Sequence, residues 1–211
     1  MKRVWGRVYL PDERDANYPI LTSVTKRTKK YWRDNYWTGD QGKTSQCVGY
    51  GWVHWLSSFP FKQWLPPEGV YNLAQRFDEW VGEHYNGSSV RGGAKALQLL
   101  KYIQEYRWGT DVETVVNAIL NTCPVVVGTN WYASMNQPVD GIIKPTGKVC
   151  GGHCYLLTGV DTKKELIRIR NSWGLDWGVL GHAYINFENM DRLIKEDGEA
   201  CIGIETDWRN Y

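Results

Sequence analysis

The first residue type that could perform nucleophilic chemistry is Cys47, which opens an almost wholly apolar run, Cys-Val-Gly-Tyr-Gly-Trp-Val-His-Trp-Leu. Such a run predicts a buried helix, and Thr44 and Ser45 stand where they can cap its first turn. The unpaired N–H groups and the dipole at a helix N-terminus favour an anion, and the thiolate is the reactive form of cysteine. Cys47 is therefore the candidate nucleophile, with a small buried core residue as the alternative.

Gln41 lies six residues before Cys47, in the turn Gly-Asp-Gln-Gly-Lys-Thr-Ser. From there its side-chain amide can lie over the start of the predicted helix, next to the backbone N–H of Cys47. Two donors aimed at one oxygen form an oxyanion hole. Gln41 is the candidate second donor.

A nucleophilic thiol needs a general base, and His153 is the best placed of the four histidines. It begins a predicted strand directly after Gly151 and Gly152, and two glycines let another chain or a substrate come close. His54 lies seven residues beyond Cys47 on the same predicted helix, about 10 Å along its axis, which is too far for a hydrogen bond. Histidine is the usual base at neutral pH, so His153 is the candidate.

Asn171 ends the predicted strand 166–171 and shares a face with Ile167 and Ile169. A polar amide that points where apolar neighbours point must be hydrogen-bonded. An imidazole N–H from the neighbouring strand is a fitting partner, and a capped strand end is the alternative. Asn171 is the candidate that orients His153.

The elements that must position these residues change in type near residue 110. Helical spacing of apolar residues predicts three helices besides the one from Cys47: 70–84, 94–106 and 111–120. Shorter apolar runs predict five strands: 124–131, 153–160, 166–171, 182–187 and 200–205. Residues 1–40 predict irregular structure. The pattern predicts one α+β domain over 1–211, with a mostly helical lobe at 35–110, a mostly β lobe at 111–211 and the site between them.

The composition is that of an ordinary globular protein, with 42 % apolar residues, 23 % charged residues and a net charge of +2. A nearly neutral chain has no field to hold nucleic acid or an anionic membrane, and its basic cluster at 26–30 is short. No apolar stretch approaches the ~18 residues that a membrane span needs. The first residues lack the apolar core of a secretory signal, which predicts a cytoplasmic chain, with a virion-associated or released form also open.

The chain has five cysteines: Cys47, Cys123, Cys150, Cys154 and Cys201. The number is odd, so at least one thiol is free unless it pairs between chains. A disulfide among the other four is one alternative. A metal site from Cys150, His153 and Cys154 is another, but the usual pair-plus-pair spacing is missing and the metal would consume the candidate base. The sequence predicts no metal and no organic cofactor.

Taken together, these residues resemble the papain-like cysteine peptidases. The strongest element is Asn-Ser-Trp-Gly-x-x-Trp-Gly-x-x-Gly at 171–181. The order of Gln, Cys, His and Asn along the chain, the six-residue spacing from Gln to Cys, and a helical lobe before a β lobe also fit that family. The resemblance covers about residues 35–205 and implies a two-lobed papain-like fold with the site in the cleft between the lobes.

The resemblance also implies a role for each residue. Cys47 would be the nucleophile, and His153 would act first as base and then as acid. Asn171 would hold the imidazole in its useful tautomer, and Gln41 would complete the oxyanion hole. Trp173 would lie over the Asn–His hydrogen bond and keep water from it. A thiolate–imidazolium pair is expected, because a fall in thiol pKa from ~8.5 to ~4 favours it by about 6 kcal/mol.

A substrate-binding role is also implied, because the family uses glycines of its helical lobe to pair with an extended peptide. Gly92 and Gly93, which would precede the 94–106 helix, are the candidates for that rung, and Trp173 is a further candidate contact. Three positions depart from the family pattern: Thr44 replaces a disulfide cysteine, Val48 replaces a tryptophan, and Gly152 stands where Asp or Asn is common. These departures indicate a compact form without that disulfide, and with no prodomain expected.

The reaction expected from this resemblance is hydrolysis of peptide bonds through a thioester acyl-enzyme, with a polypeptide as substrate and a monomer assumed. Two alternatives keep the same Cys–His site: an amidase or endopeptidase acting on cell-wall cross-links, and an acyl transferase. A third alternative is an inactive module that binds a peptide without cutting it. The identity of the nucleophile does not determine which molecule accepts the acyl group, so the sequence does not distinguish between these alternatives.

Overall fold

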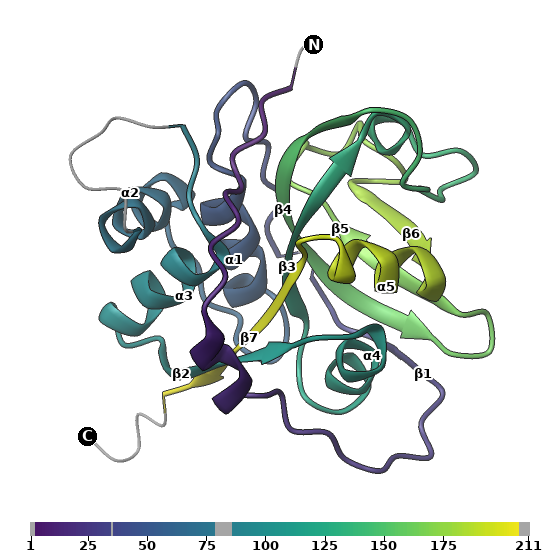
Figure 1. The fold of residues 1–211 in the computed structure, drawn as a ribbon, viewed down its shortest axis with the longest axis horizontal. Helices are drawn as coiled ribbons and strands as arrows, with labels where there is room; N and C mark the ends of the chain where they lie inside the picture. The colour runs from purple at the N-terminus through teal and green to yellow at the C-terminus, as the bar shows by residue number, and fades with distance from the viewer. Residues whose placement is uncertain (1–2, 35, 79–85, 207–211) are drawn as a thin grey trace.

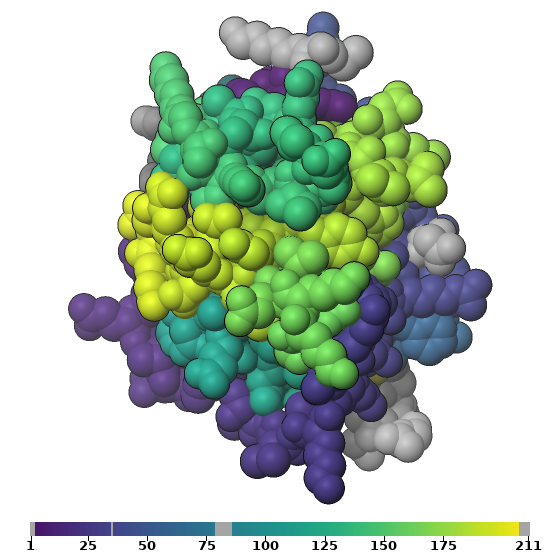
Figure 2. Space-filling view, turned by 90° about the vertical axis from the view of Figure 1, so that its right-hand side faces the viewer, coloured from purple at the N-terminus to yellow at the C-terminus, as the bar shows by residue number. Residues whose placement is uncertain are grey.

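In a computed structural model of the chain, which describes residues 3–34, 36–78 and 86–206, the helices and the sheet occupy two sides of the molecule (Figure 1). The helices on one side are α1 (Cys47–Ser57), α2 (Pro67–Phe77) and α3 (Val90–Leu99). Two more helices pack against the sheet: α4 (Val112–Asn121) and α5 (Phe187–Lys195). Figure 2, which views the sheet side, shows the yellow C-terminal region that includes α5 on the outside.

Among the described residues the sheet has seven strands, and each pair of neighbouring strands is antiparallel. Its strands run in the order β2 (Ile103–Gly109), β7 (Glu199–Glu205), β3 (Val125–Tyr132), β4 (Val149–Asp161), β5 (Leu166–Arg170) and β6 (His182–Asn186). The short β1 (Lys29–Tyr31) pairs with the far end of β4. Two 3-10 turns, Glu13–Asn17 and Ala133–Asn136, complete the elements of the described residues. This mixed helix and antiparallel sheet architecture is the predicted α+β class.

α1 is buried on all sides, as its apolar sequence predicts, and it joins the two sides of the molecule. A Cβ on Gly51 would lie 2.7 Å from Sγ of Cys154, so the helix packs directly on β4 at this glycine. The indole N–H groups of its two tryptophans are hydrogen-bonded. Nε1 of Trp52 donates to the carbonyl of Val90 at 2.9 Å, and Nε1 of Trp55 donates to the carbonyl of Pro124 at 3.0 Å. Satisfied indole groups let large rings be buried at little cost.

Two predicted helices have different bounds in the structure. The helix expected over 70–84 begins at Pro67 and ends at Phe77, and its last predicted residues fall in 79–85, outside the described residues. The helix expected over 94–106 covers Val90–Leu99 instead, and 103–109 form strand β2. Lys101 takes a positive φ of 63°, which ends the helical conformation, and pairing with β7 then favours the extended chain.

The other predicted elements are present, and two more were missed. The strands near 124–131, 153–160, 166–171, 182–187 and 200–205 correspond to β3, β4, β5, β6 and β7. α5 was not predicted, although Met190, Leu193 and Ile194 recur at helical spacing and are buried. β1 lies in the segment expected to be irregular; with three residues, it is too short to show a period.

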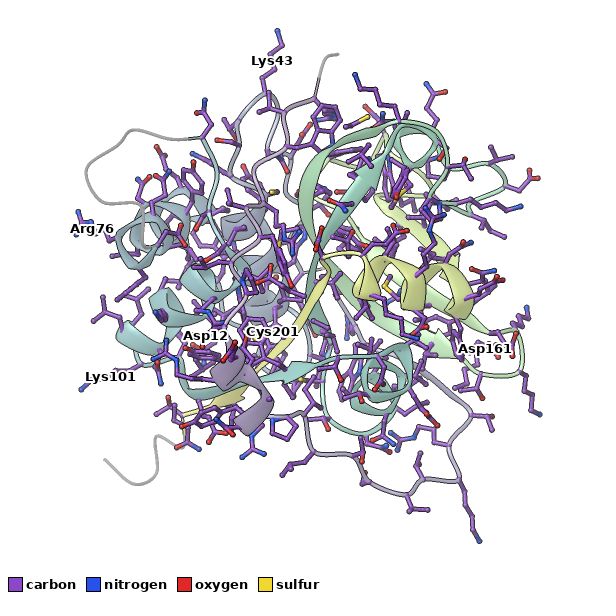
Figure 3. The ribbon with its side chains drawn as sticks, viewed as in Figure 1. Asp12, Lys43, Arg76, Lys101, Asp161 and Cys201 are labelled. Atoms are coloured by element: carbon purple, nitrogen blue, oxygen red, sulfur yellow. The ribbon has the colours of Figure 1, made fainter. Side chains whose placement is uncertain are left out.

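The N-terminal segment Arg3–Tyr9 lies between the two sides of the molecule. In Figure 1 this purple segment descends from the N-terminus in front of α1. Side chains at the outer edge of the molecule, such as Lys43 and Arg76, point away from it, whereas Cys201 on β7 lies inside (Figure 3). We call residues 3–9 the cleft segment. Among the described residues no helix has the length and apolar character needed to span a membrane.

Candidate active site

Cys47 is the first residue of α1 and is completely buried. The N-cap is Gln46, whose side chain makes no capping hydrogen bond. The two predicted capping side chains form hydrogen bonds elsewhere. Oγ1 of Thr44 donates to the carbonyl of Gln41 at 2.7 Å, and Oγ of Ser45 lies 3.1 Å from the hydroxyl of Tyr71. The capping prediction is therefore wrong, and the first N–H groups of α1 keep no side-chain acceptor from these residues.

His153 and Asn171 are joined by a buried hydrogen bond. Nε2 of His153 lies 2.8 Å from Oδ1 of Asn171, and neither side chain is exposed. An amide oxygen only accepts, so Nε2 carries the proton and Nδ1 is left as the basic nitrogen. The ring of Trp173 lies 4.9 Å from the imidazole at an angle of 35° and is 2 % exposed. The geometry places Trp173 as a cover of the imidazole.

Gln41 is held beside the start of α1 by a residue that the sequence analysis did not select. Oγ of Ser172 donates to Oε1 of Gln41 at 2.7 Å, which directs the amide nitrogen the other way. Nε2 of Gln41 donates to the carbonyl of Thr44 at 2.8 Å and to that of Val4 at 3.2 Å. Ser172 directly follows Asn171 in the Asn-Ser-Trp-Gly motif, and this position in the motif is the sequence feature from which its role could have been predicted.

The cleft segment binds to both walls of the site through its backbone. On the sheet side, the N–H of Arg7 donates to the carbonyl of Gly152 at 2.9 Å. On the helical side, the N–H of Val8 donates to the carbonyl of Ser88 at 2.9 Å, and the N–H of Ser88 donates to the carbonyl of Gly6 at 2.8 Å. An extended chain therefore bridges the two sides, as a bound peptide would.

Glycines allow this close approach. A Cβ on Gly6 would lie 1.8 Å from the carbonyl oxygen of Ser45, just before the candidate nucleophile. A Cβ on Gly152 would lie 2.1 Å from the carbonyl oxygen of Arg7. No side chain fits at either distance, so both positions require glycine. The requirement gives Gly152, one of the departures from the family pattern, a physical reason.

The electrostatic state of the site follows from this burial. Burial raises the pKa of the Cys47 thiol to about 11, although backbone N–H groups of Cys154, Gly6 and Val48 lower it in part. Burial lowers the pKa of His153 to about 4, against the opposing effect of its bond to Asn171. Among the described residues, Nδ1 of His153 has no hydrogen-bond partner. Both shifts favour the neutral thiol and the neutral imidazole over the predicted thiolate–imidazolium pair.

Gly92 and Gly93 do not form the predicted rung. Both lie inside α3, and the N–H of Gly92 donates to Oγ of Ser89, the N-cap, at 2.8 Å. The N–H of Gly93 donates to the carbonyl of Ser89 at 3.2 Å, and a Cβ on Gly93 would lie 2.2 Å from the ring of Trp52. Their N–H groups are used within the helix. Close packing of α3 on α1 explains Gly93, and the extended pairing is made by Ser88 instead.

The remaining cysteines suggest no further chemistry. All five thiols are free, so the disulfide alternative is not realised in this structure. Within residues 3–34, 36–78 and 86–206, no group of three or more His, Cys, Asp or Glu side chains could hold a metal ion.

The comparisons with known proteins agree with this geometry. Residues 68–202, more than half of the chain, match the family model described as papain family cysteine protease. The match contains His153, Asn171 and Trp173 and begins after Gln41 and Cys47. Among curated proteins, the chain is 26 % identical over 133 residues to cathepsin B-like CP3 of Giardia intestinalis. That similarity covers 56 % of this chain and 44 % of the relative, so the chain spans less than half of the relative's length.

Solved structures share the fold over nearly the whole chain. Xylellain, a cysteine protease from Xylella fastidiosa, superposes with a TM-score of 0.73 and 18 % identity, covering 97 % of this chain and 98 % of that one. Digestive procathepsin L 3 of Tenebrio molitor larval midgut superposes with a TM-score of 0.69 and 14 % identity, covering 88 % and 73 %. At these identities the likeness concerns the fold.

Proposed function

Because this chain belongs to the papain family of cysteine proteases, we propose that it hydrolyses peptide bonds with Cys47 as nucleophile. The observation that carries the proposal is the buried 2.8 Å hydrogen bond between His153 and Asn171. That bond leaves Nδ1 as the basic atom of a histidine on β4, the strand on which α1 packs. Of the alternatives drawn from the sequence, none has a specific feature in its favour.

In the first half of the reaction, the thiol proton of Cys47 passes to Nδ1 of His153, and the sulfur attacks the peptide carbonyl carbon. The carbonyl oxygen becomes an oxyanion, which the amide of Gln41 and the backbone N–H of Cys47 stabilise. Collapse of this intermediate breaks the C–N bond. The imidazolium gives its proton to the departing amine, and the acyl group stays on sulfur as a thioester.

In the second half, His153 takes a proton from water, and the hydroxide attacks the thioester carbonyl. The C–S bond breaks, the sulfur regains a proton through the imidazolium, and the acid leaves. Asn171 keeps the ring in one tautomer through both halves. A polypeptide is the proposed substrate class, and the monomeric state and cytoplasmic location stay predictions from the sequence.

The reaction requires the cleft segment to leave the site first. The Val4 carbonyl accepts a hydrogen bond from Nε2 of Gln41, and Cys47 is completely buried in the presence of the segment. Once water enters, the burial that raises the pKa of the thiol and lowers that of the imidazole is relieved. The thiolate–imidazolium pair then becomes accessible, and the bound and open forms are two states of one site.

The test is hydrolysis of an internally quenched peptide library by the full chain, compared with the variants Cys47→Ser and His153→Ala. Either substitution should reduce kcat/KM by at least about 10³-fold, because each removes a reacting group. Reaction in ¹⁸O-labelled water should place one label in each new carboxylate, which separates hydrolysis from acyl transfer to an amine.

The matched control is Cys150→Ser, which changes a partly exposed thiol outside the site and should keep the wild-type rate. Unchanged turnover in Cys47→Ser would contradict the proposal.

A further inference from the structure

The side chain of Arg7 fills a narrow slot beside the site. Its Nε donates to Oε2 of Glu199 at 2.9 Å, and its Nη2 donates to the same oxygen at 2.7 Å. Nη2 also donates to the carbonyl of Asp197 at 2.5 Å. Arg7 is 6 % exposed and Glu199 is 7 % exposed. The slot thus holds a guanidinium by charge-assisted hydrogen bonds that are shielded from water.

The slot is built into the sheet next to the candidate base. Gly128 on β3 is opposite Glu199 on β7 and also opposite Cys154 on β4, the residue after His153. A Cβ on Gly128 would lie 2.8 Å from Nε of Arg7, so the glycine opens the passage. Two strand spacings separate β7 from β4, roughly 10 Å. A peptide bound beside the histidine can therefore reach Glu199 with a long side chain.

Glu199 keeps acceptor capacity that the resting structure does not use. Its Oε1 has no hydrogen-bond partner among the described residues. A second cation near Glu199, Arg91, donates to Asp15, with Nη1 at 2.7 Å from Oδ1. When Arg7 leaves, Glu199 is a buried carboxylate without a partner, which is a costly state. A positively charged side chain relieves that cost and an apolar one does not.

The surroundings of the slot favour a cation as well. Glu199 also borders a cavity of about 560 Å³ between the N-terminal residues and the sheet. The charged residues in its lining are all acidic: Asp12, Glu13, Asp15 and Glu199. Asp12 and Asp15 are paired with Arg14 and Arg91, so Glu13, and Glu199 once Arg7 has left, supply the negative charge that attracts a cation here.

We infer that Glu199 determines the substrate specificity of this site by selecting an arginine side chain about one or two residues from the scissile bond. The distance along the peptide follows from Arg7, which is the neighbour of Gly6 at the nucleophile. Arginine is favoured over lysine because its planar guanidinium matches the carboxylate and the Asp197 carbonyl together. In the resting molecule, Arg7 occupies the place of that substrate side chain. This inference rests on the proposed peptidase function.

The experiment first maps cleavage sites in a proteome-derived peptide library with the full chain, and then measures kcat/KM for three peptides. These peptides carry arginine, citrulline or norleucine at the position that the map selects. Citrulline has nearly the shape of arginine without its charge, so its kcat/KM should be lower by about tenfold or more. In Glu199→Gln the preference for arginine over citrulline should fall to about twofold or less.

The matched control is Glu205→Gln, at the exposed end of the same strand, which should keep the arginine preference. Equal rates for arginine and citrulline in the wild type would overturn the inference, and this comparison needs no variant to fold. An arginine preference that survives in Glu199→Gln would overturn it too. Cleavage without any basic preference removes only this inference, whereas no Cys47-dependent cleavage of any peptide removes the proposed function with it.

Discussion

At the scale of single residues, the hydrogen bonds of the Gln41 amide hold it in place independently of Cys47 and His153. Ser172 donates to the amide oxygen, and the amide nitrogen donates to the carbonyls of Thr44 and Val4. Gln41→Ala should lower kcat by roughly 10²–10³-fold, with a much smaller change in KM, because an oxyanion donor acts in the transition state. Single-turnover and steady-state kinetics with one peptide substrate measure both quantities.

The control for this substitution is Gln104→Ala, a glutamine exposed on β2, which should keep the wild-type kcat. Alkylation of Cys47 by iodoacetamide should proceed at the wild-type rate in Gln41→Ala, because the thiol loses neither its base nor its helix. A parallel loss of alkylation and kcat would instead assign Gln41 to positioning Cys47.

The same scale shows which residues sequence patterns could identify. His153 and Asn171 stand in motifs whose spacing is local, so they could be predicted. Ser172 bonds to Gln41 across 131 positions, and Arg7 to Glu199 across 192. No sequence period links residues so far apart, and only the fold brings them together.

At the scale of elements, Gly6 decides whether the cleft segment can occupy the site. Its Cβ position is blocked by the Ser45 carbonyl at 1.8 Å, and backbone at the start of a buried helix cannot yield. Gly6→Ala should therefore displace the segment and raise the rate of Cys47 alkylation by about tenfold or more, because a thiol reacts only where reagent and solvent reach it. Iodoacetamide labelling of the native protein, analysed by peptide mass spectrometry, follows each cysteine separately.

Gly69→Ala is the matched control, because a Cβ there meets nothing within 4 Å. In this variant Cys47 should be alkylated as slowly as in the wild type, and alkylation of the buried Cys123 and Cys201 should stay slow in both variants. Adding His153→Ala to Gly6→Ala should reverse the gain at pH 5.5, where an unassisted thiol is almost wholly protonated. Equal Cys47 labelling in Gly6→Ala and Gly69→Ala would mean that the segment does not control access.

Elements were predictable where one period extends without interruption, as in α1, α4 and the inner strands. The error at 94–106 has a physical cause. Leu97, Leu100 and Ile103 keep helical spacing, but Leu100 is 37 % exposed and Ile103 pairs with β7. A strand gained at the edge of the sheet outweighs local helical preference. The cleft segment could not be predicted, since its partners are backbone groups and distant side chains such as Glu199, which leave no local pattern in the sequence.

At the scale of the whole molecule, two buried neutral histidines make stability depend on pH. Burial lowers the pKa of His54 to about 3 and that of His153 to about 4. Below pH 6.5 these histidines are protonated in the unfolded chain but stay neutral in the folded chain. Their contribution to the free energy of unfolding is therefore fully present above pH 6.5 and is lost as the pH falls. Glu199 acts in the opposite direction, because burial raises its pKa to about 7. A variant that changes one histidine is therefore needed to separate the contributions.

His54→Phe isolates one contribution while keeping an aromatic ring against Trp37, whose centroid lies 4.8 Å from the imidazole. The variant loses the acceptor for the N–H of Gly39, a constant cost of about 1 kcal/mol at any pH. Relative to the wild type, its free energy of unfolding should rise by roughly 2 kcal/mol between pH 7.5 and pH 4.5, because phenylalanine has no group that is protonated on unfolding. Urea unfolding followed by tryptophan fluorescence at both pH values measures the difference. The same stability gap at pH 7.5 and pH 4.5 would show that His54 titrates normally and is not held neutral by the fold.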